Sequence, residues 1–217
     1  MTFSEENYLK TIYHLTLDID SEVSTNAIAE MMDTKASSVT DMLKKLAEKD
    51  LINYKKYQGV SLTENGKLAA KMIVRKHRLW EVFLVEKLDF SWDEVHDIAE
   101  QLEHIKSEKL INKLDDFLEN PTEDPHGDPI PDASGRIIKI EKQLLCDLSE
   151  NQIGICVGVK DTSSEFLKYL DKHAISLGTK IKIISKETFD LSIKIKIDNQ
   201  ELTISSKIAS NLFVKTT

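Results

Sequence analysis

Cysteine and long apolar runs are scarce in this chain of 217 residues. The two cysteines, Cys146 and Cys156, form no CxxC pair, so we expect buried thiols in a reducing cytoplasm rather than a disulfide. No apolar run approaches the roughly 18 residues that a membrane helix needs, and the first ten residues lack the basic and apolar regions of a signal peptide. These absences predict a cytoplasmic protein with no membrane partner, and the length of 217 residues suits one large or two small domains.

Proline is also scarce, and its distribution divides the chain. All four prolines lie in the segment ENPTEDPHGDPIPDASG, which begins at Glu119. Before this segment the apolar residues recur at helical spacing, whereas after it they alternate in short runs that are typical of strands. We therefore predict a mainly α-helical N-terminal part with domains at 1–63 and 64–120, a proline-rich linker at 121–145, and a small all-β domain at 146–217.

The net charge of −8 is unevenly distributed. Residues 76–145 carry 9 basic and 17 acidic side chains, whereas residues 1–75 and 146–217 are close to neutral. Within residues 35–60 the balance is reversed, with 6 basic and 3 acidic side chains. A basic element ahead of a strongly acidic one indicates a nucleic-acid contact in the first and cation binding in the second.

Residues 1–63 show the pattern of a winged helix-turn-helix domain. The segment SEENYLKTIYHLTLD predicts a first helix with Ser4 as its N-cap. Two shorter helices follow, one capped by Ser24 or Thr25 and one after the turn DTKA, and two strand-like pieces joined by YQG predict a hairpin. In such a domain the second helix of the pair enters the DNA major groove by its N-terminal end.

The side chains expected to contact DNA are short hydroxyls and lysines. Hydroxyl groups at the start of the recognition helix can bond to phosphates and base edges, and the surrounding lysines neutralise phosphate charge. The alternative is a small helical domain with a solvated lysine face, but the helix pair and the hairpin occur in the order that favours DNA binding. The full set is Lys35, Ser37, Ser38, Thr40, Lys44, Lys45, Lys55 and Lys56.

Residues 64–120 are predicted to form a helical dimerisation unit. Apolar positions recur through residues 64–89 in one long helix, which needs a partner surface. Two further helices follow, because Ser91 and Glu94 form an S-x-x-E capping box for the first and Ser107 marks the break before the second. Since helix-turn-helix regulators usually bind two half-sites as dimers, we expect a homodimer.

After residue 146 the chain alternates between short strands and one helix. Ile181 and Ile183, and later Ile193, Ile195 and Ile197, alternate with polar residues at the period of a half-buried strand. The segment SSEFLKYLDKHA predicts a helix between the strands. A small barrel of about five strands is the simplest fold for this pattern.

The stretch HDIAEQLEH holds histidines and glutamates where an amphipathic helix would place leucines. Four of these side chains fall within a helical arc of roughly 100°: His96, Glu100, Glu103 and His104. His77 and Glu81 are likewise four residues apart on the preceding helix. Imidazole and carboxylate ligands suit Mn, Fe, Zn, Ni or Co. A polar surface stripe is the alternative, but four of the six histidines lie within residues 77–126 of the acidic region, which favours a metal site.

Six segments are shared with one known family: ENYLKTIYHL, SSVTDMLKKL, LTENGKLAA, RKHRLWEVFLVEKL, VHDIAEQLEHIKSEKL and PHGDPIP. Together they resemble the diphtheria-toxin-repressor and manganese-transport-regulator family of metal-dependent repressors. The resemblance covers essentially the whole chain and includes the C-terminal SH3-like, FeoA-type barrel of the longer members. It implies a repressor of metal-homeostasis genes, not an enzyme, that binds double-stranded operator DNA as a homodimer.

The resemblance also implies two metal sites in each subunit. The ligands of the primary site fall on Asn7, Glu100, Glu103, His104 and Asp124. The ligands of the ancillary site fall on His77, Glu81 and His96, with Glu165 or alternatively Asp161 as a contribution from the barrel. The stretch HDIAEQLEH would therefore serve both sites.

Three positions bear on the choice of metal. Iron-responsive members have Cys where this chain has Glu100 and Met where it has Asn7, whereas manganese-responsive members have Glu and Asp. Glu100 is a hard oxygen ligand that suits Mn(II), Asn7 matches neither group, and Lys10 stands where short manganese regulators have a further glutamate. We predict Mn(II) as the cofactor, with Fe(II) as the alternative.

The resulting hypothesis is a metal-controlled switch. Without metal, the acidic cluster repels itself and leaves the first helix loosely placed, whereas metal tethers the DNA-binding part to the dimer core. Two other classes are open at this point. One is a metalloenzyme that uses the His/Glu cluster, although the chain has no HExxH and no nucleophile motif. The other is a metal-independent winged-helix regulator whose barrel binds a protein or peptide.

Overall fold

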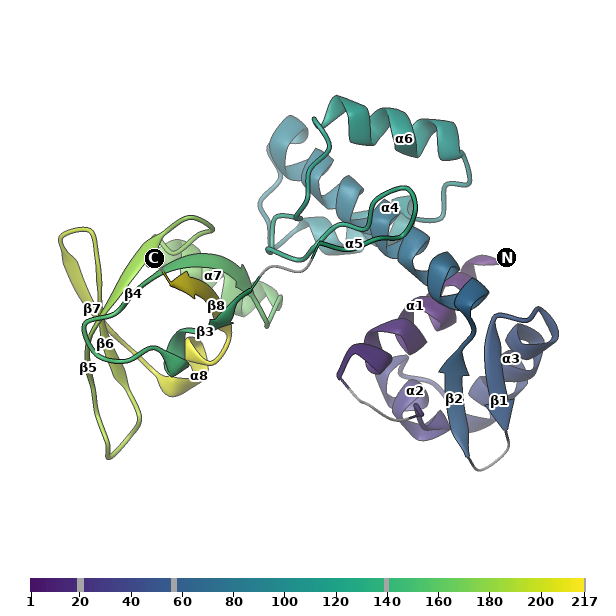
Figure 1. The fold of residues 1–217 in the computed structure, drawn as a ribbon, viewed down its shortest axis with the longest axis horizontal. Coiled ribbons are helices and arrows are strands. Elements are labelled where there is room, and N and C mark those ends of the chain that lie inside the picture. Colours follow the sequence, from purple (N-terminus) through teal and green to yellow (C-terminus); the bar gives the residue numbers. More distant parts are fainter. Residues whose placement is uncertain (19–21, 56–57, 139–140, 217) are drawn as a thin grey trace. The chain divides into compact units, whose positions relative to one another are not determined.

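The computed structural model describes residues 1–18, 22–55, 58–138 and 141–216 (Figure 1). The chain divides into two compact units. The first unit comprises Met1–Trp80, Ala99–Glu119 and Ile130–Ile137, and the second comprises Glu81–Ile98, Asn120–Pro129 and Ile138–Thr217. Two helices, α4 (Glu64–Leu88) and α5 (Val95–Leu102), continue from one unit into the other. Within the described ranges, none of the helices combines the length and the apolar character needed to cross a membrane.

The first unit begins with the predicted winged helix-turn-helix. Its helices are α1 (Phe3–Asp18), α2 (Thr25–Met31) and α3 (Ala36–Glu48), followed by strands β1 (Ile52–Lys55) and β2 (Gly59–Leu62). The two strands pair antiparallel, with Ile52 opposite Leu62, and Val23 adds an isolated bridge to Val60 on the other side of β2. The predicted order of helices and hairpin is confirmed.

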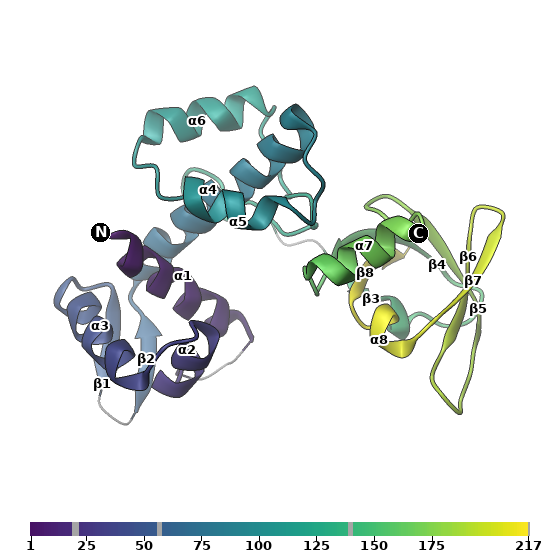
Figure 2. The same ribbon diagram turned by 180° about the vertical axis from the view of Figure 1, so that it is seen from behind.

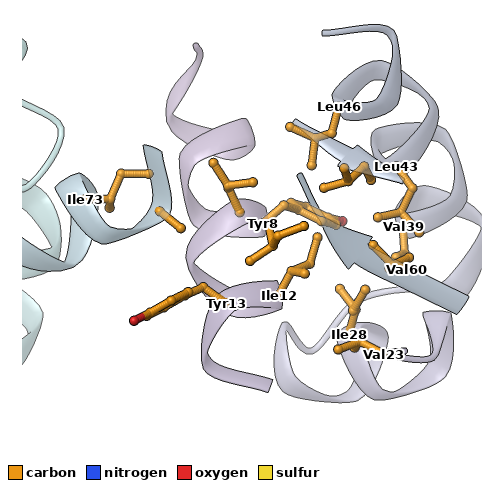
Figure 3. Close-up of a cluster of buried hydrophobic side chains, with 14 of the residues drawn as sticks. Tyr8, Ile12, Tyr13, Val23, Ile28, Val39, Leu43, Leu46, Val60 and Ile73 are labelled. Atoms are coloured by element: carbon orange, nitrogen blue, oxygen red, sulfur yellow. The ribbon is translucent and has the colours of Figure 1, made fainter. Parts of the chain in front are cut away.

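The core of this domain is built by one face of each helix and the inner side of the hairpin (Figure 3). On α3 the buried residues Val39, Leu43 and Leu46 recur at helical spacing, which turns the intervening polar residues toward solvent. Tyr8 and Ile12 of α1 point toward them, whereas Tyr13 of the same helix points away from α3. Burial of these side chains fixes α1 against the recognition helix.

The helix starts agree only in part with the predicted caps. Ser24 caps α2 as expected, with its hydroxyl accepting from Ala27 N at 3.1 Å. The prediction of Ser4 as the cap of α1 is wrong, because the helix begins earlier: Thr2 Oγ1 accepts from Glu5 N, and Glu5 Oε2 accepts from Thr2 N. This reciprocal pair is a capping box. Helix α3 begins at Ala36, one residue before the predicted entry through Ser37.

The long helix predicted from residue 64 is present as α4. Thr63 Oγ1 accepts from Gly66 N at 3.0 Å and so caps it. Gly66 lies so close to Leu51, the residue before β1, that a Cβ would stand 1.8 Å from Leu51 O, which only glycine avoids. In α6 (Glu108–Phe117), Ser107 is the N-cap, as expected from the predicted break.

The second unit contains a six-stranded antiparallel sheet, one strand more than predicted. The strands are β3 (Gln143–Leu144), β4 (Ile153–Val159), β5 (Lys180–Lys186), β6 (Ile193–Ile197), β7 (Gln200–Ile204) and β8 (Leu212–Thr216), in the order β3-β8-β4-β5-β6-β7. The short helices η1 (Leu145–Asp147), α7 (Ser164–Lys172) and α8 (Ser206–Ala209) connect them. Helix α7 lies over the sheet (Figure 2) and buries Phe166, Leu167 and Leu170 among the strand residues.

Residues 120–129 of the proline-rich segment pack along β4 within the second unit. Val159 N donates to His126 O at 2.9 Å, and a bridge joins Glu123 to Pro129. Gly127 has φ +80°, and a Cβ there would stand 2.1 Å from Val157 O. The segment is irregular in secondary structure, as predicted, but its backbone is held at a defined place, and this fixes the position of His126.

Candidate metal centres

The first cluster of acidic side chains lies in the first unit, between α1 and the end of α5. Lys10 Nζ donates hydrogen bonds to Glu100 Oε1 at 3.1 Å and to Glu103 Oε2 at 2.8 Å. Glu103 Oε1 lies equally near, at 2.8 Å, but outside hydrogen-bonding geometry. Glu103 is fully buried, whereas the side chain of Glu100 is 46% exposed. Two predicted metal ligands therefore lie beside one lysine of the first helix.

Glu103 also contacts His77 of α4. His77 Nδ1 lies 2.7 Å from Glu103 Oε2. Burial by itself raises the pKa of the Glu103 carboxyl, but the bond to His77 and the Lys10 ammonium outweigh burial and leave this pKa below its ordinary value. Glu103 is therefore ionised at neutral pH, which is the state in which a carboxylate binds a metal ion.

His104 is oriented by two residues of α1. Its Nδ1 lies 2.7 Å from Glu6 Oε2, and its ring stacks on Phe3 with the ring centroids 4.5 Å apart. Because Nδ1 is engaged by the carboxylate, Nε2 is the nitrogen that would coordinate a metal, an arrangement common among metal-binding histidines. Glu6, which is buried, was not among the residues predicted from the sequence.

Two oxygen atoms of this cluster suit a cation. Asn7 Oδ1 and Glu103 Oε1 are both buried. Asn7 Oδ1 accepts no hydrogen bond within the part of the chain that the structure describes, whereas Glu103 Oε1 lies 2.8 Å from the Lys10 ammonium. A buried acceptor without a donor costs free energy, and a divalent cation would satisfy it. Asn7 precedes Lys10 by three residues and so lies on the same side of α1. The donor set of carboxylates, one amide oxygen and imidazole therefore fits a divalent metal ion.

A second cluster lies entirely in the second unit. Glu81, Asp124 and His126 are all buried, and one ligand atom of each lies within 4.8 Å of the others. His126 Nδ1 is 3.7 Å from Glu81 Oε2 and 3.9 Å from Asp124 Oδ1. His96 approaches from solvent, with its Nδ1 3.5 Å from Glu81 Oε1. Four side chains that could ligate a metal thus come together from α4, α5 and the proline-rich segment.

His126 is held with Nδ1 toward the carboxylates. Its Nε2 bonds to Trp92 O at 2.9 Å, and Asp124 Oδ1 accepts from the backbone N–H groups of His126 and Asp128. Burial lowers the pKa of this imidazole, but Glu81 and Asp124 outweigh burial and raise the pKa to about 9. The ring is therefore protonated at neutral pH in the metal-free protein, and a metal cation at Nδ1 would replace that proton.

The remaining predicted ligands lie apart from these contacts or in a different group. Asp124 was predicted for the primary site, but the structure brings it beside Glu81 and His126. Glu165 is exposed in the first turn of α7, and the carboxylate of Asp161 accepts from Ser163 N at 2.8 Å. A ligand role for each of these residues stays a prediction.

The recognition helix presents the predicted DNA-contacting residues on its outer face. Ser37, Ser38, Lys44 and Lys45 of α3 are exposed, as are Lys35 at its N-cap and Lys55 at the end of β1. The Thr40 hydroxyl donates to Ala36 O at 2.9 Å. Asp41 faces solvent and pairs with Lys44 at 3.1 Å. Lys56 lies outside the described residues.

Three family models match consecutive parts of the chain. Residues 1–60 match the iron-dependent repressor N-terminal DNA-binding domain, residues 63–132 match the iron-dependent repressor metal-binding and dimerisation domain, and residues 143–216 match the FeoA domain. The boundary between the first two matches lies in the hairpin, and the boundary between the last two lies in the proline-rich linker.

Comparison with individual proteins gives the same result. An uncharacterized HTH-type transcriptional regulator of Methanocaldococcus jannaschii is 36% identical over 55% of this chain and 95% of its own length. The iron-dependent repressor IdeR of Mycobacterium tuberculosis is 36% identical over 58% of this chain, which spans only 54% of IdeR. A solved structure of a manganese-dependent transcriptional repressor in complex with manganese has 34% identity and a TM-score of 0.87, covering 98% of this chain and all of the other.

Proposed function

The chain belongs to the iron-dependent repressor family of metal-dependent transcriptional repressors, and on that premise we propose that Mn(II) activates it to bind operator DNA as a homodimer. It is a repressor and not an enzyme, so both the metalloenzyme and the metal-independent regulator considered from the sequence are excluded. A regulator of operator DNA acts where the chromosome is, and we accordingly place it in the cytoplasm.

We assign two metal sites to each chain. The first comprises Asn7, Glu100, Glu103 and His104, with Glu6 orienting His104. The second comprises Glu81, His96, Asp124 and His126, with Glu165 as a further ligand predicted from the sequence. The observation that carries the proposal is the buried Asn7 Oδ1, which accepts no hydrogen bond from the described residues, together with the Glu100 and Glu103 carboxylates that converge on one cation, the Lys10 ammonium.

Manganese is favoured by the hard donors of the first site. Carboxylate and amide oxygens suit Mn(II), whereas a softer metal would favour a thiolate or thioether. A manganese-dependent repressor is also among the structures similar to this chain. Fe(II) is the alternative, since the iron-dependent repressor IdeR is a relative of comparable identity.

The first site would couple metal binding to the DNA-binding domain through α1. Asn7 belongs to α1, whereas Glu103 and His104 follow α5. A bound cation supplies positive charge between the two elements. Helix α1 packs on α3 through the buried cluster, and Lys49 at the end of α3 pairs with Glu5 of α1 at 2.7 Å. The position of α1 therefore sets the position of the recognition helix.

Dimerisation is supported by α6. Leu110 is 42% and Phe117 61% exposed, and seven residues separate them, so both lie on one face of the helix. Exposed apolar side chains in such a row are typical of a subunit interface. The matching family model is described as a metal-binding and dimerisation domain.

The test begins by selecting tightly bound duplexes from a random DNA pool with the full chain and Mn(II). Fluorescence anisotropy then measures the affinity for a selected duplex with Mn(II), with Fe(II) under anaerobic conditions, and with EDTA, while ultracentrifugation measures the oligomeric state. We expect tight, metal-dependent binding by a dimer, with Mn(II) effective at lower concentration than Fe(II). Equal affinity with Mn(II) and with EDTA would refute the proposal.

A pair of variants locates the effect. Glu103→Gln combined with His104→Gln removes two ligands of the first site and should abolish metal-dependent DNA binding while circular dichroism remains unchanged. Glu108→Gln makes a comparable change at an exposed residue in the first turn of α6 and should behave like the wild type. Half-activation by Fe(II) at a lower concentration than Mn(II) would favour the iron alternative.

A further inference from the structure

We propose that Lys10 is a tethered cation that occupies the first site in the metal-free protein and that an incoming metal ion must displace. Lys10 would then set the metal concentration at which the site fills. The inference rests on the proposed function, because it assigns a role to a residue of the same site.

The geometry of the ammonium group supports this role. Lys10 Nζ lies 3.1 Å from Glu100 Oε1 and 2.8 Å from each oxygen of Glu103. Its side chain is 12% exposed, so the ion pair to the fully buried Glu103 is shielded from water. One ammonium therefore contacts three carboxylate oxygens, as a bound cation would, and it reaches them from another helix.

The ion pairs change the expected metal-free state. From the sequence, the acidic residues were expected to repel each other and to leave α1 loosely placed. With Lys10 between them, Glu100 and Glu103 are held together, because an intervening cation offsets their repulsion. Helix α1 is thus fastened to residues 100–103 by its own lysine before any metal binds.

Metal binding then becomes an exchange of cations. A divalent ion coordinated by Glu103 would stand close to Nζ, and two positive charges at such a distance repel each other strongly in a buried site. The ammonium has to leave its carboxylate partners, while α1 gains the contact through Asn7 instead. The free energy of breaking the lysine contacts is subtracted from that of binding the metal, which weakens the apparent affinity.

The test compares Lys10→Met, which keeps the length of the side chain and removes the charge, with Lys10→Arg, which keeps the charge. Isothermal titration calorimetry with Mn(II) and thermal unfolding in EDTA are measured on the full chain. Lys10→Met should bind Mn(II) about tenfold more tightly than the wild type, equivalent to roughly 1.4 kcal/mol, and unfold at a lower temperature in EDTA. Lys10→Arg should stay close to the wild type in both measurements.

One control variant and two contrary outcomes keep the inference separate from the proposed function. Lys113→Met removes an equal charge from an exposed ion pair of α6 and should change neither quantity. If Lys10→Met and the milder Lys10→Gln bind Mn(II) no more tightly than the wild type, Lys10 is not a competitor and the inference is overturned. If neither the wild type nor any Lys10 variant binds Mn(II), or if Glu103→Gln leaves the affinity for Mn(II) unchanged, the proposed function itself has failed. The role of Lys10 then fails with it.

Discussion

Glu6 Oε2 lies 2.7 Å from Nδ1 of His104, although 98 residues separate the two in the sequence. Glu6 belongs to the first turn of α1 and His104 follows α5. The contact therefore joins the DNA-binding domain to the proposed metal ligands, and it leaves Nε2 of the imidazole as the coordinating atom. A carboxylate in this position both orients the ring and increases its basicity.

The first prediction concerns this contact. Replacing Glu6 by Gln should weaken Mn(II) binding at the first site by about 10- to 100-fold, because a neutral amide replaces the charged acceptor that orients His104 and increases its basicity. Calorimetric titration of the variant measures the loss. Glu5→Gln is the matched control, since the neighbouring Glu5 pairs with Lys49 instead. An unchanged affinity in Glu6→Gln would show that the contact does not orient the ligand.

The second prediction concerns the amide at position 7. Asn7→Asp should tighten Mn(II) binding about tenfold, equivalent to roughly 1.4 kcal/mol, because a carboxylate adds negative charge where the buried amide oxygen now accepts no hydrogen bond from the described residues. Asn7→Ala should weaken binding. Electron paramagnetic resonance of free Mn(II) gives both affinities. If the aspartate and alanine variants bind alike, Asn7 is not a ligand.

The fold of the helical part could be predicted because its signals are local. The apolar spacing of α1, α3 and α4 and the caps Ser24 and Ser107 act within one or two helical turns.

Strand β3 has two residues and α8 has four, which is too short for either to show a period, so both were missed. The cap of α1 was misplaced because Ser4 and Thr2 offer the same hydroxyl chemistry two residues apart.

The candidate site was predictable only along single helices. The spacing of Glu100, Glu103 and His104 is visible in the sequence because these residues are neighbours on one face. Glu6 and Lys10 reach the same cluster from a helix more than 90 residues earlier, and spacing carries no information about such a contact. Glu6 was not predicted, and the only sequence feature near it was the pair of acidic residues, Glu5 and Glu6, directly before the predicted ligand Asn7. His126 was noted only as one of the histidines in the acidic region.

The third prediction concerns the recognition helix. Lys45→Ala should weaken operator binding and reduce the slope of log affinity against log salt by about 1, since one phosphate contact is lost. Ser37→Ala should weaken binding with little change in this slope. Anisotropy titrations at several salt concentrations with Mn(II) present measure both. Lys113→Ala on α6 is the control, and a slope that falls equally in that variant would place the effect in net charge rather than at α3.

The fourth prediction concerns the pH dependence of stability, which follows from His126. Its pKa is raised from 6.5 in the unfolded chain to about 9 in the folded, metal-free protein. A raised pKa stabilises the fold fully below pH 6.5 and loses this contribution as the pH rises through about 9, so stability in EDTA should fall over that interval by at most about 3 kcal/mol. Urea unfolding at pH 6.5, 8 and 9.5 measures the fall, and His126→Gln should remove most of it. Saturating Mn(II) should also remove it, because a ligating imidazole is already deprotonated. A His126→Gln variant with the pH dependence of the wild type would show that another group is responsible.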